Sequence, residues 1–161
     1  MTVKATDVAS YILNQTGEIT AMRLEQLLYY SQAWHLVWEQ TPLFNDPIEA
    51  WAYGPFIPNV YEHHHGLFKV GSSTFPMGDA SGLSASEVSS VDGVIDFYNT
   101  LTAQNLSDLT HGQGPWRDAR GEAPSGAACG AIIEFQSHSL SPYKNAPVEK
   151  PGHFCLATQS N

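Results

Sequence analysis

Histidines are the residues of this sequence best suited to acid–base or metal chemistry, and three of them, His63, His64 and His65, are consecutive. Neighbouring residues on a helix point about 100° apart, so a regular helix cannot bring all three imidazoles onto one metal ion. Glu62 directly precedes the run, which is not the spacing of the HExxH zinc motif. We therefore expect an exposed polar helix end here, and we assign no metal and no other cofactor to the chain.

Two other histidines have simpler expected roles. His35 lies between Trp34 and Leu36 inside a long amphipathic segment, where a partly buried imidazole that is hydrogen-bonded to a neighbour is expected. His111 precedes two glycines, so it either caps a helix end or belongs to a recognition surface. A metal-dependent hydrolase that uses His63, His65 or His111 remains the enzymatic alternative.

The sequence contains no motif for nucleophilic catalysis or phosphate binding. GxSxG, SxxK, GxxxxGK[ST] and GxGxxG are all absent. Cys129 and Cys155 lack CxxC spacing, and the small apolar neighbours of Cys129 do not activate a thiol. We therefore do not expect an enzyme.

The charge balance narrows the class of partner. Seven Lys and Arg stand against 16 Asp and Glu, and the whole net charge of −9 lies in residues 1–128. Nucleic-acid binding depends on basic side chains that neutralise phosphates, so direct binding of nucleic acid is not expected. An acidic surface suits solubility or the steering of a basic partner.

No membrane or secretory signal is visible in the sequence. No apolar run approaches the roughly 20 residues that a membrane-spanning helix needs, and the first residues lack a basic start followed by an apolar stretch. The prediction is a cytoplasmic protein without membrane contact.

Hydrophobic periodicity predicts a mainly α, single compact helical domain with a short β element. Thr20 is the expected N-cap of a long helix, and Ser84 with Glu87 forms a capping-box pattern before another. The expected helices cover residues 5–15 up to Gly17, 21–39, the segment from Pro58 to Gly66, the segment from 85 through Tyr98, and a short piece through Leu109 and Thr110. The expected strand covers 48–53 and is closed by Gly54 and Pro55, and residues 71–83 are expected to form a surface loop.

Three blocks of sequence occur together in a familiar order: LEQLLYYSQAWHL at 24–36, the stretch 42–61 with its DPIEAWAYGP core, and 106–120 with its GPWRDAR end. Over about residues 5–121 the chain resembles the SocA-like antitoxin family, also called the Panacea domain and the phage-associated GepA-like family. The resemblance implies an intracellular bacterial or phage antitoxin that binds and neutralises a toxin encoded beside it. An adaptor that delivers the toxin to a protease is the second function implied by the family. No catalytic residue carries over.

The sequence and the resemblance together divide the chain into an antitoxin domain at 1–128 and an irregular, mobile tail at 129–161. The expected partner is an adjacently encoded, basic toxin, with a protease and a second copy of the chain as further partners to consider. Aromatic residues and residues that flank turns are typical of interface cores, although filling the domain's own core is the alternative for the aromatics. The expected partner-binding residues are Trp51, Tyr53, Gly54, Pro55, Tyr61, Glu62, His63, His111 and Trp116.

Overall fold

The computed structural model describes residues 3–51 and 54–99, together with Leu101, Asn105, Ala119 and Ile133. Its helices are α1 (Ala5–Thr16), α2 (Ala21–Glu39), α3 (Pro58–His64) and α4 (Ala85–Tyr98). Its strands are β1 (Ile19–Thr20), β2 (Glu49–Trp51), β3 (Gly54–Phe56) and β4 (Lys69–Val70). The prediction of a mainly α fold with a short β element is confirmed.

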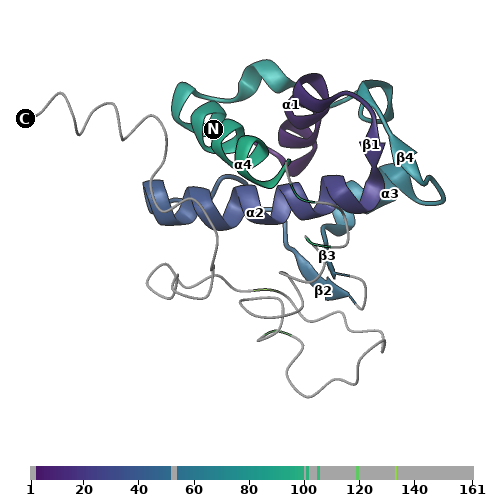
Figure 1. The fold of residues 1–161 in the computed structure, drawn as a ribbon, viewed down its shortest axis with the longest axis horizontal. Coiled ribbons are helices and arrows are strands. Elements are labelled where there is room, and N and C mark those ends of the chain that lie inside the picture. The colour runs from purple at the N-terminus through teal and green to yellow at the C-terminus, as the bar shows by residue number, and fades with distance from the viewer. Residues whose placement is uncertain are drawn as a thin grey trace, which may run out of the picture.

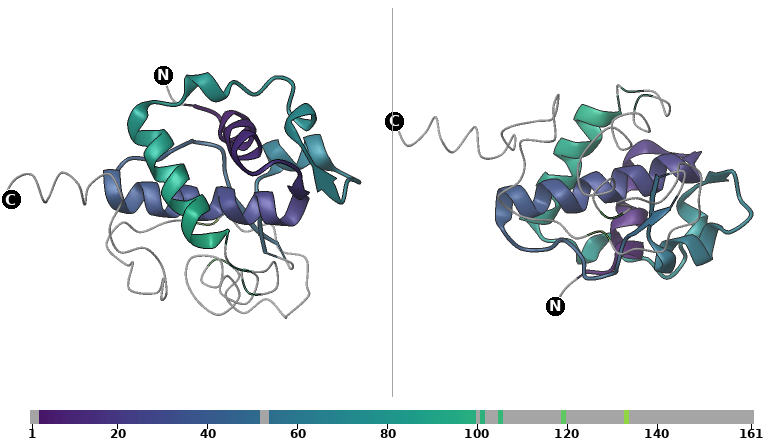
Figure 2. Two further views of the ribbon diagram at one scale, coloured as in Figure 1. Left: turned by 45° about the horizontal axis from the view of Figure 1, so that its top comes forward. Right: turned by 90° about the horizontal axis from the view of Figure 1, so that it is seen from below.

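Helix α2 is the central element of the part of the chain that the structure describes. Figure 1 shows α1 and α4 on one side of α2 and the β2–β3 hairpin on the other, and the turned views in Figure 2 agree. Every residue of α2 from Leu24 to His35 is buried, including its polar residues. A buried polar group without a hydrogen bond costs free energy. Gln32 avoids this cost, since its Oε1 accepts the Leu43 N–H at 2.7 Å and its Nε2 donates to the Phe44 carbonyl at 2.7 Å, whereas the buried side-chain polar atoms of Gln26 and Ser31 have no such partner in the described structure.

The helix boundaries that depend on local capping lie where the sequence predicts them. Thr20 Oγ1 accepts the Arg23 N–H at 3.1 Å at the start of α2. Gly17, with φ 76°, ends α1. Ser84 and Glu87 form the expected reciprocal capping box at the start of α4, with distances of 2.7 and 3.2 Å.

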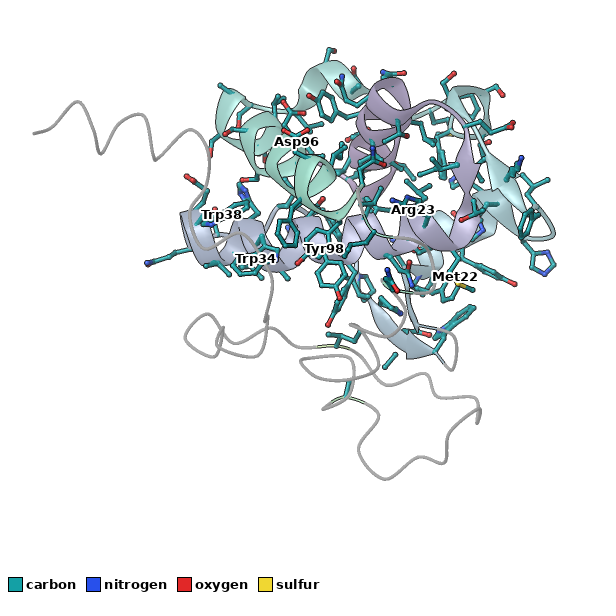
Figure 3. The ribbon with its side chains drawn as sticks, in the orientation of Figure 1. Met22, Arg23, Trp34, Trp38, Asp96 and Tyr98 are labelled. Atoms are coloured by element: carbon teal, nitrogen blue, oxygen red, sulfur yellow. The ribbon has the colours of Figure 1, made fainter. Side chains whose placement is uncertain are left out.

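The C-terminal end of α4 is held against α2 by hydrogen bonds and ring stacking. The Trp34 Nε1–H donates to the Tyr98 hydroxyl at 2.9 Å, and the Tyr98 ring stacks on Tyr30 with centroids 4.2 Å apart. Arg23 Nη2 donates to the carbonyls of Tyr98 and Asn99 at 3.2 and 3.0 Å, where the last carbonyls of a helix need donors. Arg23, Trp34 and Tyr98 are labelled in Figure 3.

Two small antiparallel pairings complete the frame. Strand β2 pairs with β3 in the register Glu49–Phe56, Ala50–Pro55 and Trp51–Gly54. The expectation that Gly54 and Pro55 close a single strand is therefore wrong, because they form the second strand of a hairpin. The φ of 135° at Gly54 allows this turn, since residues with a side chain rarely adopt it. Strands β1 and β4, which the sequence did not predict, pair Ile19 with Val70 and Thr20 with Lys69.

The segment 71–83 is more firmly packed than the surface loop we expect from its composition. It contains two 3₁₀ turns, Ser72–Thr74 and Ala80–Gly82, and the Phe75 side chain is buried in the core. Gly78 lies so close to α1 that a Cβ there would meet the Ser10 hydroxyl and, at 2.5 Å, the Thr6 carbonyl oxygen. Composition alone misses this, because one buried aromatic and one close approach fix the segment.

The expected short helix through Leu109 and Thr110 lies outside the described residues, as does nearly all of the 129–161 tail. Ile133 is the exception: it is buried, and its N–H donates to the Ile48 carbonyl at 2.7 Å, next to β2. Among the helices that the structure describes, none combines the length and the apolar character needed to cross a membrane.

Candidate partner-binding site

A buried carboxylate–imidazole pair joins α2 to α3. Glu25 Oε2 lies 2.6 Å from His64 Nε2, and Glu25 Oε1 accepts the Ile57 N–H at 3.0 Å. Both side chains are almost fully buried, with 1% of Glu25 and 2% of His64 exposed. Burial raises the pKa of Glu25 above its ordinary value, although the hydrogen bonds from His64 and Ile57 and the charge of His64 act in the opposite direction. The pair therefore holds α3 in one position on α2.

The sequence predicts an exposed end for the histidine run, and this is wrong for one of the three. His64 is buried, while His65 is exposed and packs edge-on against Tyr61 at 5.2 Å between ring centroids. His63 is partly exposed and contacts Phe75 at 5.5 Å. In residues 3–51 and 54–99, no three His, Cys, Asp or Glu side chains come together as a metal site would require.

Three aromatic side chains gather beside the buried pair, and we call them the aromatic cluster: Trp51 of β2, Phe56 of β3 and Tyr61 of α3. Their ring centroids lie 5.0 Å (Trp51–Phe56), 4.9 Å (Trp51–Tyr61) and 6.0 Å (Phe56–Tyr61) apart. The Trp51 Nε1–H donates to Glu49 Oε1 at 2.8 Å, which fixes the indole. All three rings are partly exposed, so the cluster presents apolar surface to the outside.

An open pocket of about 320 Å³ adjoins the aromatic cluster. Its walls are the first turn of α2 at residues 20–22, the side chains of Phe56, Tyr61 and His64, and the turn at residues 66–68. We call it the α2–α3 pocket. Its lining is almost entirely apolar, and two of its polar side chains bond within the protein: Thr20 Oγ1 accepts the Arg23 N–H, and His64 Nε2 contacts Glu25.

The rim of the α2–α3 pocket carries two large exposed apolar side chains. Leu67 is 50% exposed and Phe68 is 76% exposed, whereas most large apolar residues of the described chain are buried. Adjacent exposed apolar side chains of this size are characteristic of surfaces that bind other proteins. Met77, 83% exposed, is a third, and it is not part of the pocket lining.

The structure brings some of the predicted partner-binding residues together. Trp51 and Tyr61 are in contact in the aromatic cluster, and Glu62, with its side chain 69% exposed, follows Tyr61 on α3 beside His63. Gly54 and Pro55 are buried in β3, unlike the exposed turn expected from the sequence. Tyr53, His111 and Trp116 lie outside the described residues.

Sequence reasoning did not identify Glu25, the paired role of His64, or the Leu67–Phe68 rim. The available signal was weak: an acidic residue inside an apolar helix run, and two large apolar residues directly after a glycine. His35 does behave as predicted, buried with Nδ1 2.7 Å from the Ser90 hydroxyl.

A comparison with known protein families found a match. The model of the antitoxin SocA-like family, Panacea domain, matches residues 24–117. This match begins in α2, includes the aromatic cluster and the pocket lining from Phe56 to Phe68 but not residues 20–22, and covers more than half of the chain. No curated protein and no solved structure shows a significant match. The chain therefore belongs to the SocA-like antitoxin family and carries its Panacea domain.

Proposed function

We propose that this protein is the antitoxin of a toxin–antitoxin pair and neutralises a toxin encoded beside it by direct protein–protein contact. The family membership supports this proposal most strongly. The described residues also offer a feature that suits binding a protein: partly exposed aromatics next to an apolar pocket with an exposed rim.

Charge supports a basic toxin as the partner. The chain carries a net charge of −9. Glu62, one of its acidic residues, is exposed at the surface of α3. A net negative charge of this size attracts a basic partner and speeds its association.

The proposed contact surface lies on the β2–β3 hairpin and α3 and is formed by Trp51, Tyr53, Tyr61, Glu62 and His63, together with His111 and Trp116 of the third family block. Gly54 and Pro55, which are buried in β3, support this surface from below. The proposed domain that carries it spans residues 1–128. The protein acts in the cytoplasm in this proposal, by covering the surface that the toxin needs for its own activity.

Growth of cells that express the adjacent gene, alone and together with this protein, tests the proposal. Toxicity that co-expression relieves is the expected result, and the two proteins should then elute as one complex from a size-exclusion column. Toxicity that persists at full expression of this protein would refute the proposal. Immunoblots of the toxin in rescued cells separate direct neutralisation, which leaves the toxin level unchanged, from delivery to a protease, which lowers it.

A further inference from the structure

The α2–α3 pocket is held open by bonds that do not depend on a ligand. The Ala21 N–H donates to the Phe68 carbonyl at 2.9 Å, and the Leu67 N–H donates to the His64 carbonyl at 2.8 Å. The pairing of β1 with β4 and the Glu25–His64 contact fix the two sides of the pocket. A preformed pocket reduces the conformational entropy that is lost when a partner binds.

The chemistry of the pocket favours an apolar group from a protein over a polar small molecule. A small-molecule site normally directs a few polar groups at its ligand to fix the ligand's orientation. Here the Thr20 hydroxyl caps α2 and the His64 Nε2 bonds to Glu25, so these polar atoms are already engaged. What remains is mostly apolar wall, with the Tyr61 side chain as a further polar member, and the exposed rim of Leu67 and Phe68. This lining suits one large apolar side chain surrounded by a wider protein contact.

The surroundings of the pocket carry an excess of negative charge. Residues 18–70 contain six carboxylates, of which Glu25 is buried, and two Lys or Arg. Arg23 is engaged at the end of α4, and Lys69, which is exposed, follows Phe68 of the rim. Glu18, which is exposed, precedes β1, and Glu62 follows Tyr61 of the pocket wall. Among the described residues, neither carboxylate has a lysine or arginine partner. A cation that approaches this face therefore gains an unneutralised acidic partner.

We propose that the α2–α3 pocket receives one aromatic or leucine side chain of the toxin, and that a lysine or arginine near that side chain pairs with Glu62. This rests on the proposed function and specifies which contact holds the toxin. The apolar side chain supplies most of the affinity, because it leaves water on entering a preformed apolar site. The cation adds association rate and specificity, because Glu62 is solvent-exposed and its pairing is screened by salt.

Two pairs of substitutions test the proposal on the purified protein and toxin by isothermal titration calorimetry. Phe68→Ala should weaken toxin binding by about tenfold or more. Met77→Ala is its matched control, because Met77 is equally exposed but lies outside the pocket lining, and it should leave the affinity unchanged. Both side chains are exposed, so thermal melts of the two variants should match that of the parent protein.

Glu62→Lys tests the charged part, with Asp96→Lys as a control that makes the same change of charge on the exposed face of α4. Figure 3 shows Asp96 on α4, while Met22 of the pocket wall lies at the beginning of α2. Glu62→Lys should lower the affinity and reduce its dependence on salt, and Asp96→Lys should change both much less.

The outcomes distinguish a failure of the pocket proposal from a failure of the proposed antitoxin function. If the parent protein binds and neutralises the toxin while Phe68→Ala and Leu67→Ala bind it with parental affinity, the pocket is not the contact and the antitoxin function stands. If the parent protein does not bind the toxin, the proposed function and this proposal both fail. If the protein alone is a dimer that Phe68→Ala converts to a monomer, without an effect on toxin binding, the pocket's occupant is a second copy and our assignment is wrong.

Discussion

Replacing Glu25 with alanine should destabilise the folded protein by about 2–6 kcal/mol, because two buried groups lose the hydrogen-bond partner that they share. The structure gives two reasons for a value in this range. His64 would stay buried without the carboxylate that lies 2.6 Å from its Nε2, and the Ile57 N–H would lose the acceptor at 3.0 Å. A domain has only about 5–15 kcal/mol of stability, so this loss is a large fraction of the total.

Glu25→Gln is the matched control, because its amide keeps an oxygen for the Ile57 N–H and a polar group facing His64. At pH 7 it should lie within about 1 kcal/mol of the parent protein, since both buried groups keep a hydrogen-bond partner. Urea denaturation followed by far-UV circular dichroism measures both variants. Equal stabilities for Glu25→Ala and Glu25→Gln would refute the claim that the buried pair holds α3 on α2.

The difference in stability between Glu25→Gln and the parent protein should depend on pH, and the sign of this dependence follows from the burial of Glu25. Burial raises the pKa of Glu25 in the folded state above its ordinary value of 4.5, so the folded chain binds this proton more tightly than the unfolded chain. The contribution of Glu25 to stability is therefore complete below pH 4.5 and is lost as the pH rises through the raised pKa. The free energy of unfolding of Glu25→Gln should increase relative to the parent protein as the pH rises above 4.5. A difference that stays constant, or that decreases, would contradict this assignment.

Three further predictions concern the packing that supports the site. Gly78→Ala should lower the free energy of unfolding by about 1–3 kcal/mol, because its Cβ would lie 2.5 Å from a backbone carbonyl of α1. Gly71→Ala is the control, because a Cβ there would have nothing within 4 Å, and its free energy of unfolding in the same urea titration should stay within about 0.5 kcal/mol of the parent value. Tyr98→Phe should cost about 1–3 kcal/mol, since the hydroxyl that accepts the buried Trp34 Nε1–H is removed, and an unchanged denaturation midpoint would argue against this bond. Ser84→Ala should cost about 0.5–2 kcal/mol and lower the thermal midpoint, through loss of the cap of α4.

Much of the local structure was predictable from the sequence, because its causes lie within a few residues along the chain. The limits of α2, the Thr20 cap, the glycine at the end of α1 and the Ser84–Glu87 capping box all depend on groups three or four residues apart. The same holds for α3, which begins at a proline that has no N–H to satisfy. The aromatic character of the candidate surface was also visible, since Trp51 and Tyr61 were expected to take part in it.

Only the tertiary structure determined how these parts meet. Glu25 and His64 are 39 residues apart in the sequence, and the β1–β4 pairing joins residues about 50 apart, so no local pattern specifies either contact. The α2–α3 pocket is likewise formed by two separate stretches of the chain, residues 20–22 and 56–68, whose distance from one another depends on long-range packing. The sequence by itself determined the helices, their caps, the acidic charge and the family. The tertiary structure determined that the buried Glu25 holds α3 against α2 and that Leu67 and Phe68 stay exposed beside a pocket. Such contacts arise only when distant segments of the chain exclude water together.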